Sequence, residues 1–302
     1  MLIELALIFI NVITPVFALV VIGYVAGPRL GLESRTLTRY SYYILVPALV
    51  FNVIAPARVE AALAARMIAY TLVVHLALAI TGWVVAKALG RSEKMVAAYV
   101  LISVFGNVGN FGLPLIEFRL GAEAFTAATV YFLAIITIAF IIGVVAANLP
   151  TGGGLKAVLA VFKTPALIAL VPALIANLFD LRAPLFLERI ISLLAAATVP
   201  TMLVALGVQL SGLKTFQFSR DVIITSAIRL LGGPALAIVL AIPFGLTGLE
   251  RGAGIFQAAM PAAVLTSIIA MEYNLIPEFV TTTVLFSTLA SVVTLTLVMA
   301  LV

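Results

Sequence analysis

Apolar residues run in segments of about twenty along the chain, and short polar connections separate them. Each segment is long enough to cross roughly 30 Å of hydrocarbon as a helix. The connections carry turn and charged residues, as in GPRLGLESR at 27–35 and TGLER at 247–251. The pattern predicts an all-α membrane protein with ten transmembrane helices, over residues 2–26, 36–55, 66–89, 94–120, 122–148, 164–180, 183–211, 220–246, 250–274 and 277–302.

The composition supports this prediction. Of the 302 residues, 64% are hydrophobic and 10% are charged, whereas a soluble domain is roughly half apolar. The absence of cysteine excludes disulfides and thiolate metal sites. The first apolar segment is too long for a signal-peptide core and opens with Glu4, so it is expected to be retained.

The basic residues orient the chain in the membrane. They are scattered through short loops, so the net charge of +5 does not predict nucleic-acid binding. Ten lysines and arginines fall in the connections on one side and six on the other. Because positive charge marks the cytoplasmic side, both termini are expected to lie outside the cell.

The two halves of the chain resemble each other. A shift of 155 residues sets LIEFRLGAEAFT (115–126) against AMEYNLIPEFVT (270–281) and superposes Glu117 on Glu272. This indicates duplication into repeats 1–148 and 164–302, joined by a short cytoplasmic linker at 149–163. Because each repeat has an odd number of spans, the second copy must be inverted, which is typical of transporters with a substrate site near the midplane.

Both repeats carry helix breakers at matching positions, in FGNVGNFGLP (105–114) and FQAAMPAAVLTS (256–267). The residues expected to interrupt the fourth and ninth spans are Gly106, Gly112, Pro114 and Pro261. Unpaired backbone groups survive in a membrane only where they are buried in protein or line a cavity. If the spans cross there, half-helix N-termini and the amides of Asn107 and Asn110 can hold an anion. The alternative is that the glycines permit tight helix packing and Pro261 is a tolerated kink.

Few ionisable groups lie inside the predicted spans. None of the twelve acidic residues is near the middle of a span, which argues against a cation/proton antiporter, although backbone carbonyls and amides could still bind sodium. Arg229 and His75 do lie inside spans, and as cations they would favour an anionic substrate. The alternatives are snorkelling for Arg229 and neutral helix packing for His75. His75 and Gln257 are the candidates for proton or ion coupling, and Asn52 either lines the site or bonds a neighbouring helix.

The stretch GNVGNFGLPLIEFRLG (106–121) resembles the fourth-span motif of the auxin efflux carrier family, and LVPALVFNVIA (45–55) and MPAAVLTSIIAMEYN (260–274) resemble further landmarks of it. The resemblance implies two inverted five-helix repeats, as in bile-acid symporters and sodium/proton antiporters. Spans 1, 2, 6 and 7 would form a scaffold, and spans 3–5 and 8–10 a transport domain that moves like an elevator. The resemblance also implies a prokaryotic plasma membrane and a homodimer. The substrate site would include Asn107, Val108, Gly109, Asn110, Met260, Pro261, Ala262, Asn52 and Arg229.

Two departures from the family pattern bear on the substrate. The long hydrophilic central loop of plant carriers is missing, and the ninth span has no asparagine directly beside Pro261. Small carboxylates such as malate or malonate are therefore candidate substrates alongside auxin. We expect a secondary transporter that exports a small organic anion, with no cofactor and no enzymatic activity.

Two other functions remain open at this stage. One is a sodium-coupled organic-anion symporter of the bile-acid type, and the other is a membrane sensor or structural subunit that transports nothing. A third alternative is an intramembrane enzyme, whose chemistry would depend on the single histidine, His75.

Overall fold

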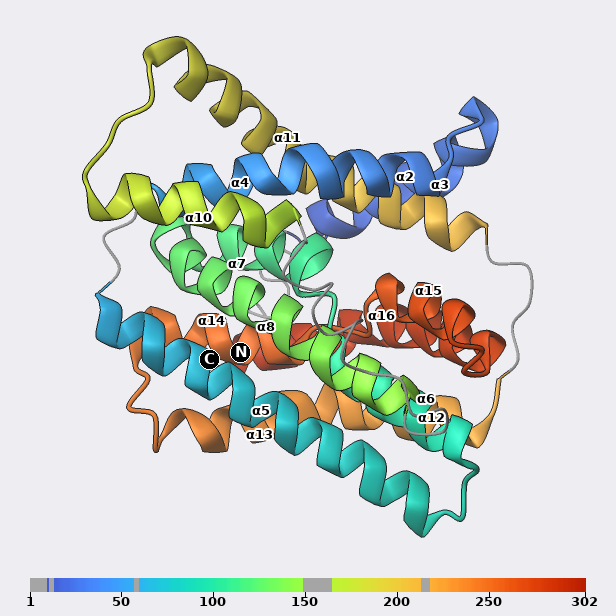
Figure 1. Ribbon diagram of the computed structural model, residues 1–302. Coiled ribbons are helices and arrows are strands. Elements are labelled where there is room, and N and C mark those ends of the chain that lie inside the picture. The colour runs from blue at the N-terminus through green and yellow to red at the C-terminus, as the bar shows by residue number, and fades with distance from the viewer. Residues whose placement is uncertain (1–9, 11–13, 57–59, 149–164, 213–217) are drawn as a thin grey trace.

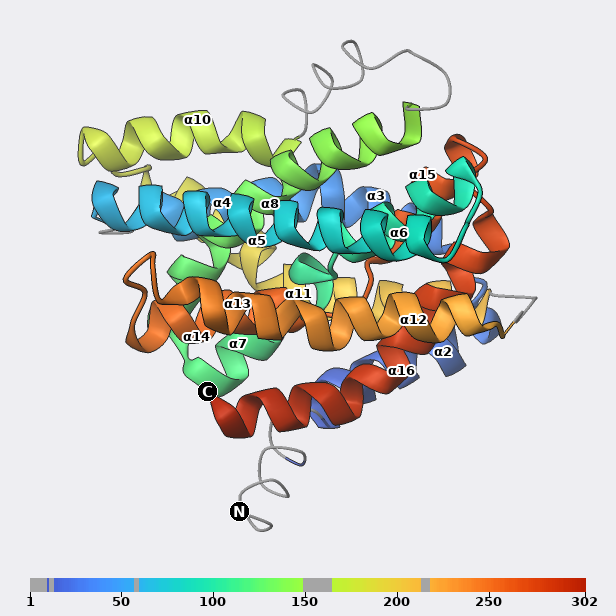
Figure 2. The same ribbon diagram turned by 90° about the horizontal axis from the view of Figure 1, so that it is seen from below.

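A computed structural model describes residues 10, 14–56, 60–148, 165–212 and 218–302, and the described segments are helical with short connections (Figures 1 and 2). The predicted linker at 149–163 and the first part of the predicted first span lie outside these residues. The elements are α2 (Thr14–Leu30), α3 (Ser34–Tyr40), η2 (Ser41–Leu45), α4 (Val46–Ile54), α5 (Ala61–Ala88), α6 (Glu93–Val104), η3 (Val108–Gly112), α7 (Leu113–Leu120), α8 (Ala122–Asn148), α10 (Pro165–Leu178), α11 (Leu185–Ser211), α12 (Arg220–Ala227), η4 (Ile228–Gly232), α13 (Gly233–Ala241), α14 (Gly248–Ala259), α15 (Val264–Glu272) and α16 (Pro277–Leu301).

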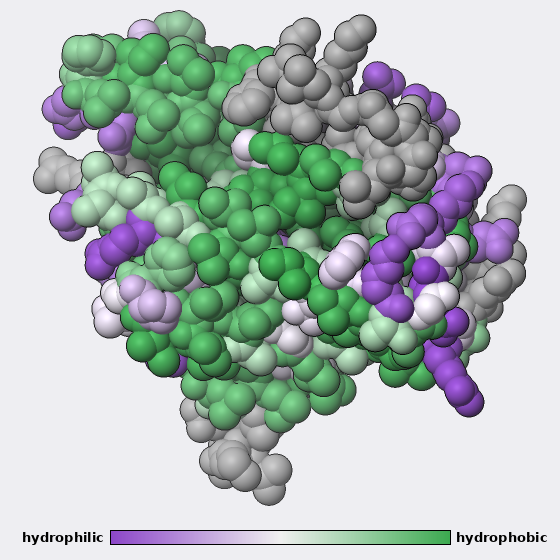
Figure 3. Space-filling view, turned by 60° about the horizontal axis from the view of Figure 1, so that its bottom comes forward, coloured by the Kyte–Doolittle hydropathy of each residue, from purple (hydrophilic) through white to green (hydrophobic). Residues whose placement is uncertain are grey.

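The predicted membrane class is confirmed by the helices and by the surface. Within the described residues, six helical stretches are long and apolar enough to cross a membrane: Ser34–Ile54, Ala61–Ala88, Ala122–Gly143, Leu185–Ser211, Arg220–Ala241 and Pro277–Leu301. The apolar helices α2 and α10 are shorter. In Figure 3, hydrophobic residues cover the middle of the face, and hydrophilic residues gather at two opposite edges. Such a band is the surface that lipid requires.

The π-helical turns η2, η3 and η4 interrupt the helices, and each is followed by a proline at the second position of the next helix. These prolines are Pro47, Pro114 and Pro234. A proline ring removes one backbone donor and clashes with the carbonyl four residues earlier, which a wider turn relieves. The breaks in regular geometry thus follow from local sequence.

The helices form two sets by their contacts. The first set is α2, α4, α10 and α11, which lie together in the upper layer of Figure 1 and pack mainly against one another. The short segments α3 and η2 belong to this set, because they pack on α11 and α4. At the closest approach in this set, a Cβ on Gly207 of α11 would collide with the backbone carbonyl of Val20 of α2. The second set comprises α5 to α8 and α12 to α16.

Within the second set, α6 and α14 are counterparts in the two halves. Both have twelve residues, and both end where the chain leaves helical geometry. The shift of 155 that aligns the two sequence segments also relates Glu93–Val104 to Gly248–Ala259. The sequence similarity therefore extends to the position of the helix breaks.

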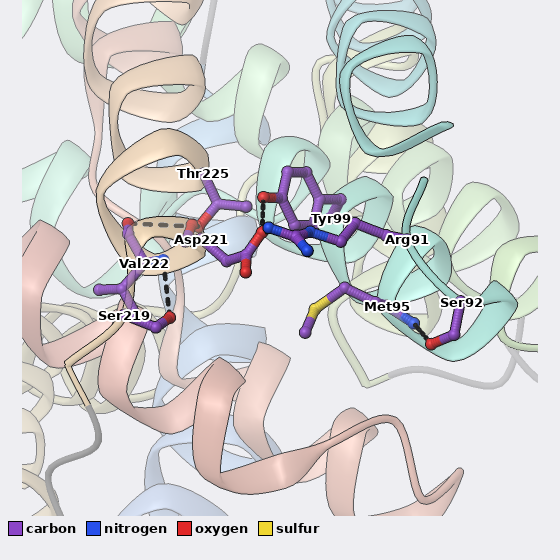
Figure 4. A network of polar contacts seen from close by, with 8 residues as sticks. All are labelled: Arg91, Ser92, Met95, Tyr99, Ser219, Asp221, Val222 and Thr225. Carbon is purple, nitrogen blue, oxygen red and sulfur yellow. Dashed lines mark hydrogen bonds and ion pairs between the residues drawn. The ribbon is translucent and has the colours of Figure 1, made fainter. Parts of the chain in front are cut away.

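A polar cluster joins the start of α6 to the start of α12 (Figure 4). The Nε of Arg91, in the turn before α6, lies 2.9 Å from Oδ1 of Asp221. Tyr99 donates its hydroxyl hydrogen to the same carboxylate oxygen. The side chains of Arg91 and Asp221 are 37% and 13% exposed, so this partly buried pair joins the two halves of the second set.

Candidate functional site

The two interrupted helices meet at their breaks. The backbone N–H of Asn107 donates to the carbonyl of Pro261 at 2.7 Å, and the N–H of Ala263 donates to the carbonyl of Phe105 at 2.8 Å. Between these bonds, Gly106 and Ala262 form an isolated antiparallel bridge. The two breaks thus provide hydrogen-bond partners for some of each other's backbone groups. These bonds lower the free-energy cost of non-helical backbone inside a membrane.

A cavity of about 320 Å³ lies beside this crossing. One wall comes from the crossing and α8, and the other from α3, η2, the start of α4 and α11. The cavity therefore lies between the two sets of helices. Its lining consists of Thr38, Arg39, Ser41, Tyr42, Val46, Phe105, Gly106, Asn107, Val108, Gly109, Phe132, Ile135, Ile136, Ala139, Met202, Ala205, Gln209, Ala263, Val264 and Leu265.

Asn107 lines this cavity and has an unused donor. The residue is 4% exposed, and its buried Nδ2 has no hydrogen-bond partner among the described residues. An asparagine before a helix usually caps that helix with its own side chain, but Asn107 makes no such bond to η3. Because a buried amide without a partner costs free energy, this donor is suited to a ligand that supplies the acceptor.

Ser41, on the opposite wall, has a second unused polar group. It is 3% exposed, begins η2, and its buried Oγ has no partner within the part of the chain that the structure describes. Asn107 and Ser41 come from different sets of helices. A ligand that bonds to both would lie across the boundary between the sets.

The charge of the cavity is positive. Arg39 of α3 is the one ionisable lining residue that carries a charge at neutral pH among the described residues, and it is exposed. The helical segments η3 and α15 begin at Val108 and Val264, and both residues line the cavity. Helix N-termini carry a partial positive charge, so both halves of the crossing favour an anion here.

Arg229 lies behind the crossing and does not line the cavity. It belongs to η4 and is 0% exposed, so it does not snorkel to an aqueous surface. Its Nε donates to the carbonyl of Met260 at 2.8 Å, and its Nη1 donates to that of Ser103 at 2.9 Å. The guanidinium therefore binds backbone at the ends of both α6 and α14.

The structure brings together only part of the predicted site. Val108, Gly109 and Gly106 line the cavity with Asn107. In the ninth span, by contrast, the lining begins at Ala263, and the N–H of Ala262 donates to Ser287 Oγ at 3.2 Å.

The remaining candidates lie elsewhere. Met260 and Pro261 are buried and offer their carbonyls to Arg229 and Asn107. Asn52 is exposed on α4 and does not line the cavity, and the side chain of Asn110 lies outside the described residues.

The interrupting residues beside the cavity also have structural roles. A Cβ on Gly112 would collide with Oε1 of Gln257, so this glycine permits the close approach of η3 and α14. Pro114 is buried in the first turn of α7, directly after the π-helical turn η3.

His75 and Gln257, the candidates for coupling, are fully buried and do not line the cavity. His75 Nδ1 lies 2.8 Å from the carbonyl of Thr71, so this nitrogen carries the proton. Gln257 Nε2 donates to the carbonyl of Ala128 at 3.2 Å. His75 Nε2 and Gln257 Oε1 have no hydrogen-bond partners in the described segments. The Gln257 bond joins α14 to α8, whereas the His75 bond lies within α5.

Several lining residues were missed by sequence reasoning. Arg39 reads as a loop charge that orients the chain, and Ser41 and Tyr42 read as the first residues of an ordinary span. The only local signal was Pro47, which accompanies the π-helical turn that positions Ser41. Contact with the crossing is a tertiary feature that no local pattern carries.

Comparison with known proteins gives two archaeal relatives over almost the whole chain. An uncharacterized transporter of Methanocaldococcus jannaschii is 25% identical over 95% of this chain and 96% of its own length. An uncharacterized transporter of Methanothermobacter thermautotrophicus is 24% identical over 93% of this chain and 94% of its own length.

A plant relative matches a shorter part. Auxin efflux carrier component 7 of Arabidopsis thaliana is 31% identical over 41% of this chain and 20% of its own length. A family model described as membrane transport protein matches residues 8–158 and 154–299. This match over nearly the whole length of the chain shows that the chain belongs to the membrane transport protein family.

Proposed function

We propose that this membrane transporter moves a small organic anion by alternating access, and that the cavity beside the crossing is its substrate site. The observation that carries the proposal is the unpartnered, buried amide of Asn107 at a cavity where two helical segments begin. A carboxylate supplies the acceptor that this amide lacks, and its charge is favoured by the helix N-termini.

The remaining lining residues narrow the substrate class. Arg39 adds a positive charge at the cavity, while Phe132, Ile135 and Met202 provide apolar walls. A volume of about 320 Å³ is at the small end of the range for ligand pockets. The substrate that fits these walls is a small carboxylate or an auxin-like acid with a carboxylate at one end.

The proposed mechanism is movement of one set of helices against the other. The set containing α2, α4, α10 and α11 would be the scaffold, and the second set, with the crossing, would be the transport domain. The separate packing of the two sets and the position of the cavity between them support this division. Export in an elevator-like motion would carry Asn107 and the bound anion past Ser41.

The proposed membrane topology has ten spans in two inverted repeats. The six long apolar helices, the shorter α2 and α10, and the two interrupted helices would supply the ten. The shift of 155 shared by sequence and helix breaks supports duplication. We further propose a prokaryotic plasma-membrane protein, with both termini outside and a homodimeric assembly.

Transport and binding can be tested separately. A thermal-shift screen of the purified protein against malate, malonate and indole acetic acid tests binding, and uptake of each acid that binds is then measured in proteoliposomes. We expect saturable flux of at least one acid. Binding without flux would identify a sensor, and neither binding nor flux of any carboxylate would refute the proposed function.

A further inference from the structure

The guanidinium of Arg229 is surrounded by backbone carbonyls. Besides the bonds to Met260 and Ser103, its Nη2 donates to the carbonyls of Ala258 at 3.1 Å and Gln257 at 3.4 Å. Ser103 lies in the last turn of α6, Gln257 and Ala258 lie in the last turn of α14, and Met260 follows α14 directly. All the acceptors therefore belong to the C-terminal ends of the two half-helices that cross.

These carbonyl ends compensate the charge of Arg229. Neither of the two ion pairs within the described residues involves Arg229. Each helix C-terminus carries about half an elementary negative charge, so two together offset roughly one positive charge. A buried guanidinium without a carboxylate is thus stable at this place, because two helices supply the balancing dipoles.

The same surroundings would suit a free cation. In transporters built from interrupted helices, half-helix C-terminal ends and unwound carbonyls coordinate the coupling sodium ion or proton, while the N-terminal ends face the substrate. This chain has the same arrangement, with the N-terminal ends at the cavity and the C-terminal ends at Arg229. The place where such carbonyls could bind a cation is occupied by an arginine side chain.

Little space remains for an additional ion. Arg229 is fully buried, and a Cβ on Gly106 would collide with its guanidinium. A side chain at position 106 would therefore displace the guanidinium from this place. A second positive charge would also be repelled by the guanidinium at short range.

We propose that Arg229 is a built-in cation that takes the place of a coupling sodium ion at the crossing, so that the transporter works without sodium. The inference rests on the proposed function, and it adds to that function that no sodium ion couples transport at this site. Because the charge is covalently attached, it neutralises the C-terminal ends in every state. The positive N-terminal ends at the cavity are then left to act on the anion.

The first test is the ion dependence of the unmodified protein. Its melting temperature is measured in sodium chloride, potassium chloride and N-methylglucamine chloride at equal concentration, and carboxylate flux is measured with and without sodium. We expect no difference among the three salts and no loss of flux without sodium. A sodium-specific rise in melting temperature, or flux that disappears without sodium, would overturn the inference.

The second test empties the proposed cation site. In Arg229→Ala the carbonyls lose their partner, so we expect a lower melting temperature. Guanidinium chloride or sodium chloride at millimolar concentration should then raise this melting temperature by roughly 2–4 °C relative to N-methylglucamine chloride. The matched control is Arg182→Ala, which removes an exposed arginine from the connection before α11 and should melt like the unmodified protein in all these salts. A folded Arg229→Ala that gains nothing from either cation would overturn the inference.

If Arg229→Ala does not fold, a comparison of two other variants at this position tests the inference. Arg229→Lys keeps the charge, and Arg229→Met keeps a side chain of similar length without charge. We expect the lysine variant to melt clearly higher, because an ammonium group still bonds several carbonyls. Equal melting of the two would show that packing, not charge, is needed and would overturn the inference.

These outcomes distinguish the inference from the proposed function. If a carboxylate is transported only with sodium, the function stands and the inference fails. If no carboxylate is bound or transported, the proposed function fails, while the melting comparisons still decide whether Arg229 occupies a cation site.

Discussion

The side chain of Asn107 provides the sharpest test of the proposed substrate site. Replacing it with alanine removes a buried donor that has no partner among the residues that the structure describes. The backbone at this position, with φ −77° and ψ 52°, suits alanine, and no helix cap is lost because the side chain makes none. The bonds of the Asn107 backbone to Pro261 and Gly112 do not depend on the side chain.

The magnitudes follow from these contacts. A hydrogen bond to a charged group contributes about 1.5–3 kcal/mol, so its loss should weaken carboxylate binding roughly 10- to 150-fold. An unpaired buried donor itself costs about 1–3 kcal/mol, and its removal offsets the lost packing of the side chain. The free energy of unfolding should therefore change by no more than about 1 kcal/mol.

The assay pairs carboxylate flux in proteoliposomes with thermal unfolding of the same preparation. Asn52→Ala is the comparison, because Asn52 is also an asparagine but is exposed and lies outside the cavity. We expect Asn107→Ala to lose affinity and flux at nearly unchanged stability, and Asn52→Ala to keep both. Undiminished affinity and flux in Asn107→Ala would refute the placement of the anion at this amide.

Three further predictions address other parts of the molecule. Arg39→Gln should weaken carboxylate uptake by up to about fivefold at low ionic strength, and uptake measured at increasing salt should show the difference disappearing. Gly106→Ala should lower the free energy of unfolding by about 1–3 kcal/mol, because its Cβ collides with the guanidinium of Arg229, and an unchanged melting temperature would contradict the packing described. Asp221→Ala should destabilise the protein by about 1–3 kcal/mol, because the buried hydroxyl of Tyr99 loses its acceptor and Arg91 loses its partner, measured by thermal unfolding against the exposed-site control Arg182→Ala.

The sequence by itself determined the class of the molecule and the places where its helices break. Apolar segments of membrane-spanning length and short charged connections follow from composition and spacing, and they require no knowledge of packing. The interruptions near Gly106 and Pro261 were also readable, because proline and glycine act on the backbone of their own helix. Asn107 could be singled out because it lies directly after Gly106, within the first interruption.

The tertiary structure decided which polar groups face the cavity and which are used inside the protein. Arg229 looked like a candidate for anion binding, yet its guanidinium is engaged by carbonyls of α6 and α14, which are distant in sequence. Arg39 and Ser41 looked like ordinary residues at the start of a span, yet they line the cavity. A hydrogen-bonding group is available to a ligand only if no neighbour has already satisfied it, and those neighbours come from distant segments that only folding brings together.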